Sequence, residues 1–265
     1  RIFQLFYLRM SESTTTKHSR SFERPLNLQL TSYMISLSSS SLEKFDTYVQ
    51  SYESLHASSV SISGERPAYF HDYKVQCLKR HGVGSGSVVL DYGCGIGNLT
   101  ERFFQLTSSV AAFDPSLKSV EVCRQRAPKG TFYTRSSDIP LAAFDATILS
   151  GVLHHVPREQ RPSVMKNVFS VTKPGGRVFI FEHNVLNPYT RRVIRDCPFD
   201  DDADLLRAGE VARLVKVGGF DWVVSEYIVF FPRFLGFLRS FESKLSWLPL
   251  GAQTLTIGIK SDEAM

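Results

Sequence analysis

A glycine-rich turn between an apolar run and a helix-like pattern constrains the fold of this chain more than any other feature. The segment VVLDYGCGIGNLT occupies residues 88–100 and places glycine at positions 93, 95 and 97. Glycine lets a backbone turn tightly and approach a ligand where a Cβ atom would collide. The apolar run predicts a buried strand over 87–90, followed by a helix over 98–106. Asp91 then stands at the carboxyl end of that strand, where parallel sheets bind their ligands.

The spacing of these glycines distinguishes between nucleotide ligands. A dinucleotide-binding loop would carry its third glycine at position 98, where this chain has Asn98. A second short strand, expected over 109–113, ends at Asp114, whose carboxylate is placed to bind both hydroxyls of a ribose. The loop therefore favours an adenosine cofactor other than NAD. The alternatives that need no ligand are a tight strand-to-helix turn and a helix cap at Asp114.

Strand-like and helix-like patterns alternate along the rest of the chain, which indicates one doubly wound α/β domain over 42–265. Further helices are expected over 116–126, 160–171 and 208–217, with an aromatic helix over 232–245. Further strands are expected over 131–135, 143–149, 177–181, 222–230 and 254–259. Helical spacing over 42–81 predicts an N-terminal helical cap. Residues 1–41 are rich in Ser and Thr without periodicity, so we expect a disordered tail there.

Composition argues against several classes of protein. The chain has 265 residues, 43% of them hydrophobic, and can bury a substantial core. Its net charge of +5 comes without a basic stripe, so no nucleic-acid partner is expected. The four cysteines are far apart, which predicts reduced thiols, no metal site and a cytoplasmic location. No apolar run approaches the roughly twenty residues of a membrane span.

Polar side chains follow two further strands at the ligand edge of the predicted sheet. Ser150 ends one strand, and the next residues, GVLHHVP, carry His154 and His155. The strand VFIF is followed at the same edge by Glu182, His183 and Asn184. A grouping of titratable residues beside the glycine loop indicates a reaction site. In the alternative interpretation, one of the paired histidines packs under the next helix and the other faces solvent.

Two downstream segments also have two interpretations each. The charged residues 187–206 form either a solvated face or a lid over the pocket. Aromatic and leucine side chains recur at helical steps over 230–245, which predicts a core position for Phe234, Leu238, Phe241 and Leu245. In the alternative, the side chains that face an apolar substrate or a partner are Phe231, Phe237 and Trp247.

Seven motifs in order resemble the class I S-adenosylmethionine-dependent methyltransferases, in particular a bacterial group that acts on small molecules. They are FDTYVQSYESLH, SGERPAYFHDYK, LDYGCGIGNLT, GVLHHVP, KPGGRVFIFEHNVLNPYTRR, CPFDDDADLL and LPLGAQTLTIGIK, and they cover about residues 45–260. The resemblance implies a Rossmann-like, doubly wound, seven-stranded sheet whose last strand is antiparallel. It also implies a methyl acceptor held under the N-terminal cap.

The resemblance further implies that the cofactor, S-adenosyl-L-methionine, is bound by Asp91, Gly93, Gly95 and Asp114. Asn98 and Ser150 are predicted to complete this set. The family commonly has an acid where this chain has Arg135, so the predicted adenine contact moves to Ser137 or Asp138.

The expected function is methyl transfer to an oxygen or nitrogen of a small-molecule acceptor. A methyl group on a sulfonium is already activated, so the protein must mainly place the acceptor in line and exclude water. A base is needed only for a hydroxyl or a protonated amine, and the predicted catalytic residues are His155, Glu182 and His183. The competing hypotheses are an NAD-dependent oxidoreductase and a non-catalytic cofactor-binding module.

Overall fold

The computed structural model describes residues 60–197 and 203–262, apart from the side chain of Ile62. All of these residues belong to one compact unit. The predicted tail over 1–41 and the first part of the predicted cap, residues 42–59, lie outside the described residues. Within the described part, no helix is long and apolar enough to cross a bilayer.

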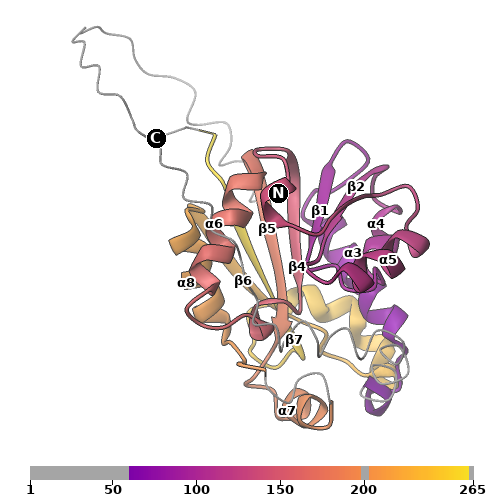
Figure 1. Cartoon of the computed structure of the whole chain (residues 1–265). Coiled ribbons are helices and arrows are strands. Elements are labelled where there is room, and N and C mark those ends of the chain that lie inside the picture. Colours follow the sequence, from indigo (N-terminus) through magenta and orange to yellow (C-terminus); the bar gives the residue numbers. More distant parts are fainter. Residues whose placement is uncertain (1–59, 198–202, 263–265) are drawn as a thin grey trace, which may run out of the picture. The chain divides into compact units, whose positions relative to one another are not determined.

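A seven-stranded sheet forms the centre of this unit (Figure 1). The strands are β1 (Val88–Tyr92), β2 (Ser109–Phe113), β3 (Thr131–Tyr133), β4 (Phe144–Ser150), β5 (Thr172–His183), β6 (Trp222–Ile228) and β7 (Gln253–Ile259). Their order is β3-β2-β1-β4-β5-β7-β6. Strands β1 to β5 run parallel, and β7 pairs antiparallel with both β5 and β6. The predicted doubly wound sheet with an antiparallel last strand is confirmed.

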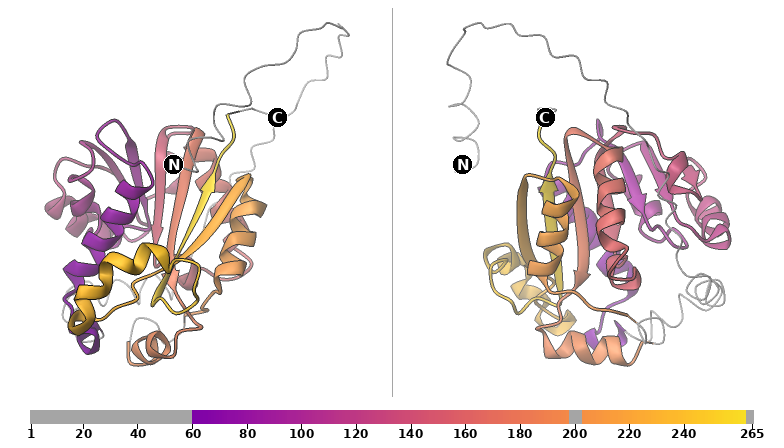
Figure 2. Two further views of the ribbon diagram at one scale, coloured as in Figure 1. Left: turned by 180° about the vertical axis from the view of Figure 1, so that it is seen from behind. Right: turned by 60° about the vertical axis from the view of Figure 1, so that its left-hand side comes forward.

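Helices cover both faces of the sheet, which explains why the central strands are continuous apolar runs. The α-helices are α3 (Pro67–Arg80), α4 (Thr100–Phe103), α5 (Leu117–Arg126), α6 (Arg161–Val171), α7 (Pro188–Arg195) and α8 (Ala208–Gly218). The 3₁₀ segments are η1 (Ser61–Ser63), η2 (Ser136–Asp138), η3 (Leu153–His155) and η4 (Arg233–Lys244). On one face, Leu90 of β1 belongs to the apolar cluster that contains residues of α6 and α8. On the other, its neighbour Val89 belongs to the cluster of α3 and α4, and Figure 2 shows these layers from two sides.

Local signals fix where several of these helices begin. The side-chain oxygen of Ser116 accepts from the backbone N–H of Ser119 (3.1 Å) and caps α5. The side chain of Asn187 caps α7 in the same way, with Pro188 as the first helical residue. The helix expected over 98–106 is shorter than predicted, because the loop of positive-φ glycines extends to Gly97 and α4 begins only at Thr100.

The prediction that Phe234 and Phe241 lie in the core is wrong, because these side chains are 77% and 50% exposed. Glu242 explains the difference, since its buried carboxylate accepts from the Tyr73 hydroxyl (2.5 Å) and from two backbone N–H groups, those of Phe230 (3.1 Å) and Phe231 (3.0 Å). A buried carboxylate must keep such partners. These bonds turn Glu242 inward and the neighbouring aromatic rings outward.

Candidate active site

A cavity of about 440 Å³ opens at the carboxyl ends of β1, β4 and β5. The glycine loop forms one side, α3 lies opposite, and the residues just before η4 close a third side. The volume falls within the roughly 300–1,000 Å³ that is common for small-molecule sites. Most of the predicted site residues line this cavity: Asp91, Gly93, Gly95, Asn98, Asp114, Ser150, His155, Glu182 and His183.

The three loop glycines have two different tasks. Each adopts a positive φ, of 84° at Gly93, 51° at Gly95 and 84° at Gly97. A Cβ atom at Gly93 would lie 2.5 Å from a methyl group of Val152, and one at Gly97 would lie 2.7 Å from the sulfur of Cys123. Around Gly95 nothing lies within 4 Å of that position, and the residue faces the cavity. Gly93 and Gly97 thus permit packing, whereas Gly95 leaves room for a ligand against the backbone.

Two carboxylates hold the loop in place. Asp91 is 1% exposed and accepts a hydrogen bond from the Thr100 hydroxyl (2.6 Å). Burial raises the pKa of Asp91 to about 7, the charge of Asp114 adds to this effect, and the Thr100 bond and the Lys74 charge oppose it. The carboxylate of Asp114 accepts from the backbone N–H groups of Gly95 (2.9 Å) and Ser116 (2.9 Å).

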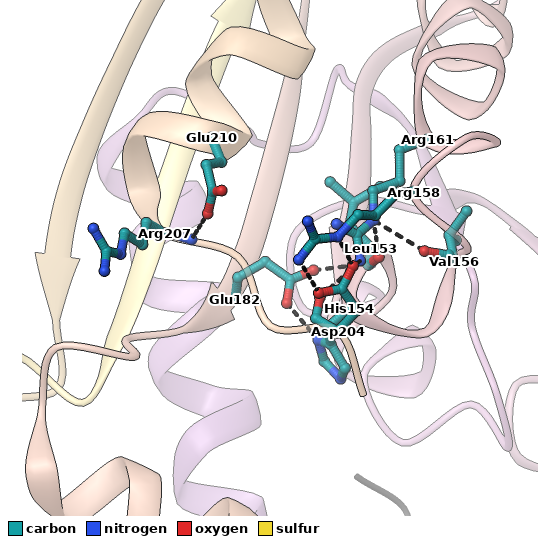
Figure 3. A network of polar contacts seen from close by, with 9 residues as sticks. All are labelled: Leu153, His154, Val156, Arg158, Arg161, Glu182, Asp204, Arg207 and Glu210. Atoms are coloured by element: carbon teal, nitrogen blue, oxygen red, sulfur yellow. Dashed lines mark hydrogen bonds and ion pairs between the residues drawn. The ribbon is translucent and has the colours of Figure 1, made fainter. Parts of the chain in front are cut away.

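Glu182 connects β5 to η3 through two buried hydrogen bonds (Figure 3). One oxygen accepts from the backbone N–H of Leu153 (2.9 Å), and the other lies 2.5 Å from Nδ1 of His154. Both side chains of the His154–Glu182 pair are 2% exposed. Burial favours the neutral acid, but the charge and hydrogen bond of His154 outweigh it and hold the pKa of Glu182 below its usual value. Glu182 is therefore a carboxylate that positions η3.

An arginine fixes the same turn from the opposite side (Figure 3). Nε of Arg161 donates to the carbonyls of Leu153 (3.0 Å) and Val156 (2.9 Å). Nη2 of Arg161 donates to the carbonyl of Asp204 (2.7 Å), whose own N–H donates to the carbonyl of His154 (2.9 Å). Because hydrogen bonds hold both ends of η3, the position of His155 in the cavity wall is fixed.

Three imidazole rings gather beside this carboxylate. The ring of His154 lies 4.1 Å from that of His155 and 5.4 Å from that of His183, measured between centroids. His155 and His183 reach the cavity wall from η3 and from the end of β5. Among the described residues, no group of three His, Cys, Asp or Glu side chains is arranged to hold a metal ion. The three rings place hydrogen-bonding nitrogen atoms at or beside the cavity wall.

Two predicted site residues lie elsewhere. The sequence predicts that Asn184 lies in the pocket, but it is 2% exposed and donates to the carbonyls of Pro249 (3.0 Å) and Gly251 (2.7 Å). It therefore fixes the segment before β7. Asp138 pairs with Arg135 (3.0 Å) on η2 and is not among the residues that line the cavity. An adenine contact of Asp138 thus has no support from the cavity lining.

Sequence reasoning missed Lys74. Its Nζ donates to the Ser150 hydroxyl (2.8 Å) and lies 5.6 Å from the centre of the Phe181 ring. Burial lowers the pKa of Lys74 to about 8, against the opposing charges of Glu182 and Asp91. Helical spacing places Lys74 one turn after Phe70 on α3, but only the docking of that helix over the sheet brings both residues to the cavity.

The comparisons with known proteins agree with this geometry. Residues 89–176 match a family model described as a methyltransferase domain. An uncharacterized methyltransferase of Anoxybacillus flavithermus is 24% identical over 154 residues, which cover 55% of this chain and 68% of that protein. The mitochondrial ubiquinone biosynthesis O-methyltransferase of Schizosaccharomyces pombe is 31% identical over 121 residues, covering 41% of this chain and 42% of that protein. The chain spans about half or less of the length of the ubiquinone biosynthesis O-methyltransferases that it matches.

Solved structures share the fold. A S-adenosylmethionine-dependent methyltransferase of Thermotoga maritima, described as a possible histamine N-methyltransferase, superposes with a TM-score of 0.58 at 16% identity. That match covers 83% of this chain and all of the other, 100%. The magnesium protoporphyrin IX methyltransferase of Synechocystis, solved with bound S-adenosylhomocysteine, gives a TM-score of 0.55 at 16% identity, with 83% and 99% covered.

A parallel sheet into which the last strand of the sequence inserts antiparallel, with a glycine loop at the ligand edge, defines the class I methyltransferase fold, and the family match includes that loop. Residues 89–176 therefore carry a methyltransferase domain, in a chain that has the fold of the class I S-adenosylmethionine-dependent methyltransferases. The cavity beside Gly95 has the open backbone that S-adenosylmethionine would require.

Proposed function

We propose that this methyltransferase acts on an oxygen or nitrogen atom of a small, largely apolar molecule. The observation that carries this proposal is a single cavity that joins the glycine loop to a histidine and lysine cluster and to aromatic walls. The names of several relatives, the ubiquinone biosynthesis O-methyltransferases, support an oxygen acceptor.

We assign the cofactor to the loop side of the cavity. Asp91, Gly93, Gly95 and Asp114 would hold it, with Asn98 and Ser150 at the margins. When bound, S-adenosylmethionine supplies a methyl group on a sulfonium, which needs no further activation. The protein's own task is then to hold the acceptor in line and to exclude water.

The acceptor side lies between α3, η3 and the segment before η4. Its walls are mainly apolar and include Phe70, Phe181, Phe230 and Phe231. Two lining residues of the described part, Tyr69 and Gln253, each bury a side-chain oxygen that has no hydrogen-bond partner in the protein. An unpaired buried polar atom costs free energy, so these oxygens favour an acceptor that carries its own polar group.

Proton removal falls to the groups nearest the acceptor side. With a pKa of about 8, Lys74 is partly neutral near that pH and can take a proton from a hydroxyl or an ammonium group. His155 is the second base, held by η3. Glu182 bonds His154 and the backbone of η3, so we assign it the role of positioning η3 and no direct contact with the acceptor.

The test is methyl transfer to defined acceptors. The full chain is incubated with S-adenosylmethionine and phenols, catechols, aliphatic alcohols or amines that carry apolar substituents, and S-adenosylhomocysteine and product are measured by mass spectrometry. Lys74→Met and His155→Asn should keep S-adenosylhomocysteine affinity, and loss of a true base should lower turnover roughly a hundredfold or more. Product methylated on carbon, or no binding of S-adenosylhomocysteine, would contradict the proposal.

A further inference from the structure

A strip of exposed, mostly aromatic side chains runs along η4 and the turn after it, and we call it the aromatic strip. We use this name for Phe234, Phe237, Phe241, Trp247 and Leu250, whose side chains are 77%, 75%, 50%, 73% and 63% exposed. Five of the twelve large hydrophobic side chains that are exposed in the described part thus come from seventeen consecutive residues. Concentrated exposed apolar groups mark interaction surfaces in stable proteins.

The exposure of the strip is built into the fold. Glu242 is turned inward by its bonds to Tyr73 and to the backbone before η4. Arg239 is also turned inward, where it pairs with Glu65 (2.6 Å) and stacks over the ring of Tyr69 (4.2 Å to the centroid). Two polar residues of η4, Arg239 and Glu242, therefore face the protein while the aromatic residues face outward, the reverse of an ordinary surface helix.

The strip borders the mouth of the cavity. Phe230, Phe231 and Pro232 line the cavity and lead directly into η4. On the other side, Tyr189 of α7 lines the cavity and is still 39% exposed. The side chain of Asn187 donates to the carbonyl of Leu250 (2.6 Å) and joins α7 to the end of the strip. Both views of Figure 2 place η4 (gold) and α7 at the carboxyl edge of the sheet.

The charges beside the strip are positive. From 229 to 252 the only acid is Glu242, which is buried, so the exposed charges on this segment are Arg233 and Lys244. The neighbouring α7 adds three exposed arginines, Arg191, Arg192 and Arg195. The C-cap residue Asp196 is an exposed acid that lies 3.9 Å from Arg192 and 3.5 Å from Arg195. Aromatic rings flanked by basic residues are the composition of segments that lie in the interface of a bilayer.

We propose that the aromatic strip docks onto the surface of an anionic lipid bilayer, so that the cavity mouth faces the membrane. The protein would then take a lipid-dissolved acceptor directly from the bilayer, and this second step rests on the proposed function. The proposal concerns binding at the interface, where rings enter the boundary between headgroups and acyl chains and the basic side chains pair with lipid phosphates.

The test is co-flotation of the full chain with vesicles of phosphatidylcholine alone or mixed with phosphatidylglycerol. We expect binding to the mixed vesicles that weakens with salt. Phe234→Ser and Phe237→Ser should each weaken partitioning roughly tenfold, because each removes a ring from the apolar contact. Arg233→Gln combined with Lys244→Gln should remove the preference for phosphatidylglycerol.

Trp222 supplies the matched control. It is 76% exposed but lies on the edge strand β6, so Trp222→Ser should leave flotation unchanged. The chain has two tryptophans, so in Trp222→Phe the emission of Trp247 alone should shift to the blue on mixed vesicles. Binding of S-adenosylhomocysteine checks the fold of every variant and tests the proposed function separately.

Three results would overturn the inference. The first is no flotation by a protein that binds S-adenosylhomocysteine. The second is flotation that the Phe234 and Phe237 variants retain in full. The third is a dimer in light scattering that the Phe237 variant dissociates, which would make the strip an interface between two copies of the chain.

Discussion

Asp91 lies at the end of a buried strand, and its carboxyl group also lines a cavity. Burial favours the neutral acid, whereas a cationic ligand in the cavity would favour the carboxylate. Burial raises the pKa of Asp91 to about 7, well above the ordinary value of about 4 for an aspartate. Between those values the unfolded chain is ionised and the folded chain is protonated, so the stability that Asp91 contributes falls as pH rises from about 4 to 7. A cationic ligand beside it would reverse the preference and release a proton.

We therefore predict that S-adenosylmethionine binds more tightly as pH rises toward 7, by up to about tenfold per pH unit, and that the dependence levels off above it. Asp91→Asn should bind weakly with no such pH dependence. Titration calorimetry in buffers of different ionisation enthalpy measures both the affinity and the proton released. Asp145→Asn is the control, since Asp145 pairs with Lys173 (2.9 Å) and does not line the cavity. A pH dependence that persists in Asp91→Asn would assign the titration to another group.

Lys74 provides a second prediction at the scale of one residue. A lysine with a pKa of about 8 is largely neutral at about pH 8.5 to 9. Ordinary lysines are still charged in that pH range. Brief acylation followed by peptide mass spectrometry should label Lys74 early, with a rate that rises between about pH 7 and 9. S-adenosylhomocysteine alone should protect it less than an acceptor analogue does. Equal protection by S-adenosylhomocysteine would place Lys74 on the cofactor side.

The three glycines of the loop all adopt a positive φ, but they differ in the protein atoms that lie around them. We expect Gly97→Ala to destabilise the fold by about 1–3 kcal/mol, because its Cβ would also lie 2.9 Å from the backbone of Cys123. Gly95→Ala meets no protein atom, so it should cost only about 1 kcal/mol for the left-handed backbone while reducing cofactor affinity. Urea denaturation and calorimetry on both variants check this separation. Unchanged affinity in a folded Gly95→Ala would move the ligand off the loop.

η3 depends on Glu182 for its conformation. Glu182→Gln keeps an acceptor for the N–H of Leu153 but loses the charge beside His154, so we expect a loss of about 1–3 kcal/mol in the free energy of unfolding. Because the pKa of Glu182 is lowered, this stabilisation is present above the ordinary carboxyl range and is lost as pH falls through the folded value. Denaturation curves at neutral and acidic pH measure it. Glu210→Gln, at the exposed start of α8, is the control.

At the scale of the whole molecule, ligand binding and stability are linked. S-adenosylhomocysteine at a hundred times its Kd should stabilise the fold by about 2.7 kcal/mol, since only the folded state binds it. For a domain of this size that corresponds to roughly 5–10 °C in Tm. NAD should give no shift. Thermal denaturation with each ligand measures the difference, and a shift with NAD alone would favour the oxidoreductase hypothesis over methyl transfer.

The sequence allowed a good prediction of the fold, and several of the residues that it placed at strand ends line the cavity. Residues such as Asp91 and Asp114 are predictable because strand ends and glycine turns are local signals. Lys74 was missed because its position depends on the docking of α3 over the sheet, a long-range contact. The exposure of Phe241 was missed for a related reason, since helical spacing gives the residues that share a face and only Glu242 and its distant partner Tyr73 decide which face turns inward.

The position of β7 has a consequence for how the chain folds during synthesis. β7 lies between β5 and β6, yet it is the last described strand in the sequence, and β6 pairs with β7 alone among the described strands. While β6 leaves the ribosome, β5 and β6 both present unpaired edges that only residues 253–259 can fill. Such edges invite association with other chains. Completion of the sheet must therefore wait for the final strand, and nascent chains that stall before it are the species most exposed to aggregation.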